Sequence, residues 1–301
     1  MGRSLRLGTP ALNGFACPAC REALDELECP GCGARYPLED GIPVLLAPDV
    51  RTGEKGRQAA WFDELDGEYE TERPAGTPAF HAWLLAEKFS RGTSELRAVL
   101  PGSKALVVCG GSGMDAEFLA RAGARARTAD LSVRAAQRAR ERARRHGIEL
   151  TAIVADAESL PFADRSVDVV YVHDGLHHVD RPLLALAEMA RVARHAVSVN
   201  EPARAAATSI AVRTRLALER EEAGNQVRRL TLDEVTGTLR AHGFRIVRAE
   251  RYAMLYRHEP GIVSRALSRR RVRPLAVRAV RALDPIGARI GNKLTVQAVR
   301  E

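Results

Sequence analysis

The sequence has little that would mark a secreted or membrane protein. Arg3 and Arg6 near its start are not followed by an apolar core, so we expect no secretory signal. No uninterrupted apolar run approaches the roughly 20 residues that span a bilayer, so we expect no transmembrane segment. Only five cysteines occur in 301 residues. We therefore expect a cytoplasmic protein in a reducing compartment, where clustered cysteines indicate metal ligands rather than disulfides.

Acidic residues are outnumbered by basic ones. The chain has 38 Asp and Glu against 46 Lys and Arg, which gives a formal net charge of +8. Such an excess permits an anionic partner such as nucleic acid or a membrane surface. The preference for arginine over lysine is explained equally well by a GC-rich genome, so the charge alone does not choose a partner.

Four of the five cysteines form two Cys-x-x-Cys pairs separated by a short spacer. Each pair forms a turn that directs two sulfur atoms at one centre, and two such turns supply the four thiolates of a tetrahedral zinc site. Because all four positions are used, the spacing predicts a closed, structural zinc site. The alternative is a ribbon that has lost its metal and keeps reduced thiols. The predicted ligands are Cys17, Cys20, Cys29 and Cys32.

The segments 35–37 and 41–46 are predicted as short strands that complete this module. A module of this size lacks a sufficient core, so the metal would supply much of its folding free energy. Over residues 15–47 the pattern resembles the small zinc-ribbon activator proteins that partner tRNA and protein methyltransferases. It resembles less closely the zinc-ribbon front end of rRNA guanine methyltransferases. We expect a zinc-ribbon domain over residues 1–48, beginning with a loose tail before Phe15.

Residues 49–100 are predicted as a linker followed by helices. The stretch 49–56 is polar, and much of the aromatic content of the chain follows between Trp61 and Phe89. Phe80, Trp83 and Phe89 have helical spacing. Two interpretations remain open, because these helices either pack on the next domain or form a lid over a substrate pocket.

From residue 103 onward the pattern alternates between strands and helices, which predicts an α/β fold with a parallel, doubly wound sheet over residues 101–301. Strands are predicted at 105–108, in a short segment that ends at residue 130, and at 151–155, 167–172 and 196–200. A helix is predicted after Pro202 to about Glu222, and another begins with the capping box Thr231 to Glu234. Further strands are predicted at 244–255 and 294–299.

Chemistry-bearing residues stand at the predicted carboxyl ends of these strands, where ligands bind in such sheets. The first strand runs into the glycine-rich turn Cys109 to Gly113. Asp130, 17 residues after Gly113, ends the second strand, where a carboxylate accepts hydrogen bonds from ribose hydroxyls. Asp156 ends the third strand, where with Ala157 it can face an adenine edge.

These motifs together resemble a class I S-adenosylmethionine-dependent methyltransferase, of the subgroup with Leu-Pro-Phe before the fourth strand (methyltransferase type 11-like). The resemblance rests on Gly111-x-Gly113, Asp130, the run from Asp156 to Asp168, and His177-His178-x-Asp180. It implies a Rossmann-like sheet of seven strands whose last strand is antiparallel. It also implies S-adenosylmethionine as cofactor, held by Cys109, Gly111, Gly113, Asp130, Leu131, Asp156, Ala157 and His173.

The glycine-rich turn departs from the family pattern at two positions. The family usually has an acidic residue where Val107 stands and a glycine where Cys109 stands. Val107 removes a carboxylate that helps to seat the methionine ammonium, and Asp115 is a candidate to replace that charge. A relative that has lost its cofactor therefore remains an alternative.

The activity that we expect is methyl transfer to a small-molecule metabolite. Because the sulfonium methyl group is already activated, positioning supplies much of the rate, and a base matters only if the acceptor loses a proton. The candidate catalytic residues are Asp174, His177 and Glu201, with Glu201 expected at the pocket rim. The alternatives are an RNA methyltransferase that docks through the ribbon and an Arg-rich segment at 265–289, and a non-catalytic binding protein. Oligomeric state is not encoded in these motifs.

Overall fold

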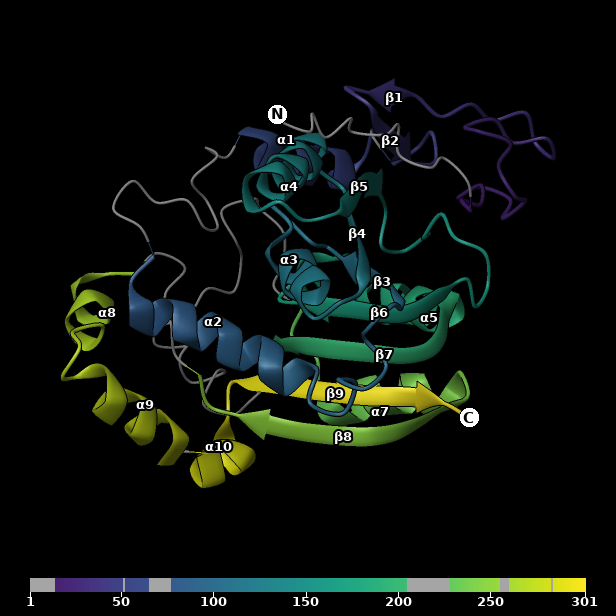
Figure 1. Cartoon of the computed structure of the whole chain (residues 1–301). Helices are drawn as coiled ribbons and strands as arrows, with labels where there is room; N and C mark the ends of the chain where they lie inside the picture. Colours follow the sequence, from purple (N-terminus) through teal and green to yellow (C-terminus); the bar gives the residue numbers. More distant parts are fainter. Residues whose placement is uncertain (1–13, 51, 65–76, 205–227, 255–259, 283) are drawn as a thin grey trace.

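A computed structural model describes residues 14–50, 52–64, 77–204, 228–254, 260–282 and 284–301 (Figure 1). Its centre is a twisted sheet with the strand order β1-β2-β5-β4-β3-β6-β7-β9-β8. The order runs outward in both directions from β3, which follows from right-handed βαβ crossovers that place helices on both faces. The predicted doubly wound α/β fold is confirmed.

Seven of these strands form the predicted Rossmann-like sheet. Five pair with one another in parallel, and β9 runs antiparallel to both of its neighbours, β7 and β8, so β8 points the same way as the five. The strands β3, β5 and β6 are largely apolar because both of their faces are covered. The bounds are β3 Lys104–Val108, β4 Arg125–Asp130, β5 Leu150–Ala155, β6 Val167–His173, β7 Ala193–Pro202, β8 Phe244–Tyr252 and β9 Lys293–Arg300.

The N-terminal module adds two further strands to this sheet. β1 (Leu38–Glu39) and β2 (Ile42–Leu45) form a short antiparallel pair. β2 then pairs in parallel with β5, with Val44 opposite Val154. The module therefore covers the edge of β5, which would otherwise present unpaired backbone groups.

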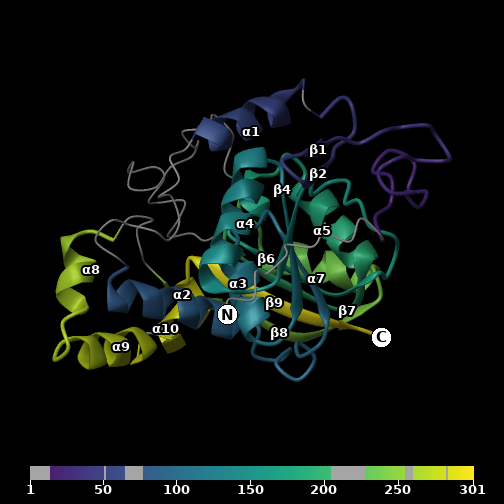
Figure 2. The ribbon, with the colours of Figure 1, turned by 45° about the horizontal axis from the view of Figure 1, so that its top comes forward.

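Helices cover both faces of the sheet. The helices α2 (Ala79–Gly92), α3 (Met114–Arg121) and α4 (Val133–His146) pack on one face, and α5 (Pro182–Val192) and α7 (Leu232–Ala241) on the other (Figure 2). Ser132 caps α4, and the capping box that the sequence predicts at Thr231 and Glu234 is present at α7. A short 3-10 helix, η1 (Leu176–His178), follows β6.

The segment before β3 is more helical than its composition suggests. Helix α1 (Glu54–Glu64) begins inside the stretch predicted as a polar linker, so that prediction is wrong from residue 54 onward. It is favoured by its contacts with α4 rather than by an apolar face of its own. The helices α8 (Ile262–Leu267) and α9 (Arg273–Ala282) lie beyond α2, and α10 (Asp284–Ile290) packs against β8 (Figure 1). The predicted tail and most of the helix predicted after Pro202 lie outside the described residues.

Among the residues that the structure describes, no helix has the length and apolar character needed to cross a membrane.

Candidate functional site

A cavity of about 180 Å³ opens at the carboxyl ends of the parallel strands. Its floor comes from the turn after β3 and from the ends of β4, β5 and β6, and its walls come from α1 and α2. This is the edge where the strand order reverses, the usual ligand site of a doubly wound sheet. Of the residues expected to hold a cofactor, those that line the cavity include Cys109, Gly111, Asp130, Leu131, Asp156, Ala157 and His173.

The turn between β3 and α3 has a backbone that favours glycine. Gly111 has φ +51° and Gly113 has φ +82°, and a Cβ on Gly113 would lie 2.8 Å from the Cβ of Ala139 in α4. Cys109 adopts the same left-handed region, with φ +53°, although it carries a side chain. The space for that side chain comes from Gly175, where a Cβ would lie 2.5 Å from the Cβ of Cys109. Burial raises the pKa of the Cys109 thiol well above its usual value, so the side chain stays neutral.

The two predicted carboxylates lie on neighbouring strands and both line the cavity. Asp130 accepts the N–H of Gly111 at 2.9 Å and the N–H of Ser132 at 3.0 Å, so it is fixed against the glycine-rich turn. Asp156 is 7% exposed and accepts the N–H of Glu158 at 2.9 Å. Because β4 and β5 pair in parallel, with Asp130 opposite Val154, their ends meet at one edge. Each carboxylate has acceptor capacity beyond these bonds.

Helix α1 contributes a wall that the sequence did not reveal. The Lys55 ammonium lies 2.6 Å from Asp156 and 3.0 Å from Glu158, and these carboxylates raise its pKa although burial acts to lower it. Gln58 donates to the carbonyl of His178 at 3.0 Å, and the ring of Phe62 meets the ring of His178 edge-on. A single lysine in a polar stretch has no spacing signal that would have identified it.

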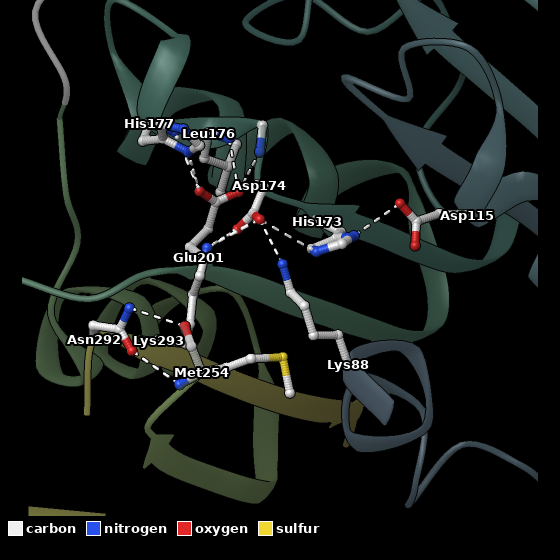
Figure 3. A network of polar contacts seen from close by, with 11 residues as sticks. Lys88, Asp115, His173, Asp174, Leu176, His177, Glu201, Met254, Asn292 and Lys293 are labelled. Carbon is white, nitrogen blue, oxygen red and sulfur yellow. Dashed lines mark hydrogen bonds and ion pairs between the residues drawn. The ribbon is translucent and has the colours of Figure 1, made fainter. Parts of the chain in front are cut away.

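Asp115, His173 and Asp174 line the cavity and belong to a row of alternating charges (Figure 3). Asp115 lies 2.9 Å from His173, whose other ring nitrogen lies 3.4 Å from Asp174. Asp174 is approached by Lys88 at 2.5 Å and by Lys293 at 2.8 Å. Asp115, Lys88 and Lys293 come from α3, α2 and β9, so the row joins these three elements to the end of β6.

The pKa values in this row follow from burial and neighbouring charge. Burial alone would lower the pKa of His173, but the carboxylates of Asp115 and Asp174 together outweigh it and raise the pKa to about 9. Burial lowers the pKa of Lys88 to about 8, against the opposing effect of Asp174. Burial would raise the pKa of Asp174, yet Lys293 and Lys88 hold it well below its usual value. His173 is therefore a cation and Asp174 an anion at neutral pH.

Asp115 is placed so that it can supply the carboxylate that the glycine-rich turn lacks at Val107. Val107 is 1% exposed and packs in the core beneath α3, away from the cavity lining. Asp115 lines the cavity, and among the described residues its Oδ1 has no hydrogen-bond partner. A buried carboxylate oxygen without a partner is destabilising unless a ligand satisfies it.

The three candidate catalytic residues are not equivalent in the structure. Asp174 lines the cavity. Glu201 is 1% exposed, so its expected position at the rim is wrong. It accepts the N–H groups of Gly175 and Leu176 at 2.7 and 2.8 Å and the ring nitrogen of His177 at 2.8 Å. Glu201 and His177 thus hold the η1 loop from below, while His178, which was not among the three candidates, lines the cavity.

The four cysteines of the N-terminal module meet at one point. Their sulfur atoms all lie within 4.8 Å of one another, with Cys17 and Cys32 at 3.7 Å and Cys20 and Cys29 at 3.4 Å. A tetrahedral zinc ion with Zn–S bonds of about 2.3 Å requires sulfur–sulfur edges of about 3.8 Å. The cluster fits zinc in ligand type, number and spacing.

This module also contacts the segment that follows Asp156. The N–H of Ala16 donates to the carbonyl of Pro161 at 3.0 Å, and Ser159 donates to the carbonyl of Pro18 at 2.7 Å. The rings of Phe15 and Phe162 lie 5.7 Å apart. The cysteine-bearing turns therefore contact one side of the loop that follows Asp156.

The central region of the chain matches a known protein family. Residues 106–197 match the family described as "Methyltransferase domain". A demethylmenaquinone methyltransferase of Renibacterium salmoninarum is 32% identical over 136 residues, which are 45% of this chain and 54% of the relative. A ubiquinone/menaquinone biosynthesis C-methyltransferase of Idiomarina loihiensis is 34% identical over 159 residues, 51% of this chain and 61% of the relative. The chain thus spans about half the length of the curated relatives it matches.

Solved structures support the fold. Magnesium protoporphyrin IX methyltransferase from Synechocystis, solved with bound S-adenosylhomocysteine, superposes with a TM-score of 0.52 at 14% identity, covering 84% of this chain and 97% of that one. The [4+2]-cyclase SpnF superposes with a TM-score of 0.51 at 20% identity, covering 79% and 85%. Because a cyclase shares the fold, the fold alone does not fix the reaction.

Proposed function

We propose that this chain, whose central region is a class I methyltransferase domain, transfers a methyl group from S-adenosylmethionine to a small-molecule acceptor. The observation that carries this proposal is the placement of Asp130, Asp156 and the turn at Gly111 around one cavity. Two carboxylates on adjacent strand ends, beside a glycine-rich turn, suit the ribose and the base of an adenosyl group.

Different residues of the cavity would bind different parts of the cofactor. Asp130 would accept the ribose hydroxyls, and Asp156 with Ala157 would hold the adenine edge. Asp115, with its unpartnered buried oxygen, would accept the methionine ammonium in place of the acid that Val107 lacks. S-adenosylmethionine supplies an activated sulfonium methyl group, so the chain's own task is to orient the acceptor and to exclude water.

The acceptor side of the cavity suits a small organic molecule. Phe62, Leu85 and Val179 supply apolar surface, and His81 and His178 supply polar atoms beside it. Apolar walls with a few polar groups are typical of small-molecule sites. The named activities of the relatives, C-methylation in quinone biosynthesis, support an acceptor with an electron-rich ring. Asp174 and His178 are the cavity residues proposed to bind its hydroxyl groups, with His177 and Glu201 positioning their loop.

We further propose a structural zinc ion at Cys17, Cys20, Cys29 and Cys32. The proposed domains are a zinc ribbon over 1–48, a connecting helical lid over 49–100 and the methyltransferase domain over 101–301. The lid is supported by α1 and α2, which both line the cavity.

The experiment that tests this function uses S-adenosylmethionine with a labelled methyl group. The purified protein is incubated with prenylated hydroquinones in one reaction and with total RNA in another. Label in the hydroquinone fraction, lost in Asp130→Ala and kept in Asp233→Asn on the exposed surface of α7, supports the proposal. Label in RNA alone would replace the small-molecule acceptor, and absence of cofactor binding would favour a non-catalytic protein.

A further inference from the structure

The helices α8 and α9 present an outer surface that the proposed reaction does not use. In α8, Ser264, Leu267 and Ser268 are half-buried at helical spacing, whereas Ile262 and Val263 are 86% and 72% exposed. In α9, Ala276, Val277 and Val280 pack toward a cluster beneath α2, and Leu275 on the opposite side is 64% exposed. These two consecutive helices therefore expose three large aliphatic side chains, Ile262, Val263 and Leu275, a feature typical of contact surfaces.

The same surface is strongly basic. Between Pro260 and Leu283 the chain has seven arginines and no acidic residue. Arg281 is engaged by Glu87 at 3.2 Å and stacks over Trp83. The other six are all exposed, and they are Arg265, Arg269, Arg270, Arg271, Arg273 and Arg278. A partner of this surface must therefore be anionic and must also accept aliphatic side chains.

This surface lies close to the cavity wall. The N–H of Phe80, in the first turn of α2, donates to the hydroxyl of Ser268 at 2.9 Å. The next residue, His81, lines the cavity, as does Leu85 one turn later. Figure 1 shows α8 and α9 at the outer edge of the molecule, beyond α2. One helix, about 10 Å across, thus separates the basic surface from the cavity.

We propose that the surface formed by α8 and α9 docks on a bilayer that contains anionic lipids. Basic helices with exposed aliphatic residues lie in the membrane interface, where arginines meet phosphate groups and aliphatic side chains enter the acyl boundary. A bilayer satisfies both properties at once. The phosphates of RNA would bind the arginines, but RNA has no apolar region to contact Ile262, Val263 and Leu275. Residues 260–283 also contain no aromatic side chain on which bases would stack.

Docking in this orientation places the α2 wall of the cavity beside the lipid. An acceptor dissolved in the bilayer would then reach the site without crossing water; this consequence alone rests on the proposed function. The docking itself is independent of it, because it needs neither cofactor nor acceptor.

The test is co-sedimentation of the full chain with vesicles, without cofactor. Vesicles of phosphatidylcholine alone are compared with vesicles that contain phosphatidylglycerol as about one third of the lipid. We expect binding to the anionic vesicles that weakens as salt rises, because part of the attraction is electrostatic. Equal retention on neutral and anionic vesicles, or none on either, would overturn the proposal.

Matched variants locate the surface. Arg269→Gln with Arg270→Gln is compared with Arg144→Gln with Arg145→Gln, a pair on α4 that is also exposed. The first pair should weaken vesicle binding about tenfold or more, and the second should leave it nearly unchanged. Val263→Ser, at a residue 72% exposed, is compared with Val99→Ser at one 43% exposed. Equal loss in both members of either comparison would contradict a docking site on α8 and α9.

A competing partner is tested in the same assay. A structureless RNA is added at increasing concentration to protein bound to anionic vesicles. Displacement at sub-stoichiometric RNA, with Val263→Ser binding RNA as tightly as the unmodified chain, would assign the surface to nucleic acid instead. Retention on the vesicles supports the bilayer.

Discussion

Lys55 and Asp156 are 101 positions apart in the chain, and their charged groups meet at 2.6 Å. The contact joins α1, which precedes the Rossmann-like domain, to the carboxylate that is proposed to hold the adenine. The Lys55 side chain also reaches Glu158 at 3.0 Å, so one ammonium neutralises two carboxylates of the same loop. Helix α1 is therefore fastened over the cavity by an ion pair that is only partly exposed to solvent.

Replacing Lys55 should loosen α1 over the cavity. In Lys55→Met the side chain keeps its length but loses its charge, so α1 loses its ion pairs with Asp156 and Glu158, while its contacts with α4 and His178 remain. We expect S-adenosylhomocysteine to dissociate several-fold faster, as measured by stopped-flow fluorescence of Trp61, with Lys55→Arg close to the unmodified protein. Identical dissociation rates in Lys55→Met and Lys55→Arg would show that α1 does not retain the ligand.

The left-handed backbone at Cys109 predicts an ordered series of stabilities. A β-branched residue is strained at φ +53°, so Cys109→Val should lower the free energy of unfolding by about 2 kcal/mol relative to Cys109→Gly. Urea denaturation measures the difference. The same pair of substitutions at Ser112, in the turn but without a recorded positive φ, serves as the control. An equal effect at both positions would mean that backbone conformation does not explain the glycine usual at position 109.

Removing the metal should weaken ligand binding at the proposed adenosyl site, because the cysteine turns contact the loop that follows Asp156. If zinc holds the turns that contact Pro161 and Ser159, chelation should weaken S-adenosylhomocysteine binding several-fold. It should also raise hydrogen exchange in residues 157–162, a readout that does not depend on activity. Ser159→Ala should weaken binding with the metal still present, whereas Ser166→Ala, which removes a similar local bond, should not. If hydrogen exchange in residues 157–162 stays unchanged after verified metal loss, the ribbon does not order this loop.

The pKa of His173 predicts a pH dependence of stability. Its pKa is raised from 6.5 to about 9 by Asp115 and Asp174, so the folded state binds the proton more tightly than the unfolded state. The stabilisation is fully present below pH 6.5 and is lost as pH rises through about 9, in total by up to about 3 kcal/mol. Lys88 acts in the opposite direction above its pKa of about 8.

The unmodified protein is compared with His173→Gln, which cannot bind the proton that His173 binds. The difference in unfolding free energy between the two proteins should be larger at about pH 6 than at about pH 9. Denaturant titrations at both pH values measure this difference, which includes the change in Lys88 titration, because the charges of His173 and Lys88 repel each other. A difference that grows with pH would show that His173 is neutral when folded.

The parts of the site that the sequence predicted are those set by local patterns. Asp130 and Asp156 follow apolar strands, and parallel strands end at one edge, so their meeting in one cavity follows from topology alone. The cysteine cluster follows from two turns of fixed geometry.

The parts that were missed depend on contacts between distant segments. The pairing of β2 with β5 joins residues 110 positions apart, such as Val44 and Val154, and no local signal specifies it. Helix α1 has no apolar face of its own and is ordered by α4 and by Lys55. Glu201 was expected at the rim because it ends a strand, but its side chain turns beneath the η1 loop, where three N–H groups of Gly175, Leu176 and His177 converge on it.

The most direct test of the proposed function is calorimetric titration with S-adenosylhomocysteine. The unmodified protein should bind one equivalent. Asp130→Asn and Asp156→Asn should each bind at least tenfold more weakly, because each loses a charged acceptor worth about 1.5–3 kcal/mol, while Asp233→Asn should bind normally. Absence of binding by the unmodified protein, or equal affinity in all four proteins, would contradict an adenosyl site between Asp130 and Asp156.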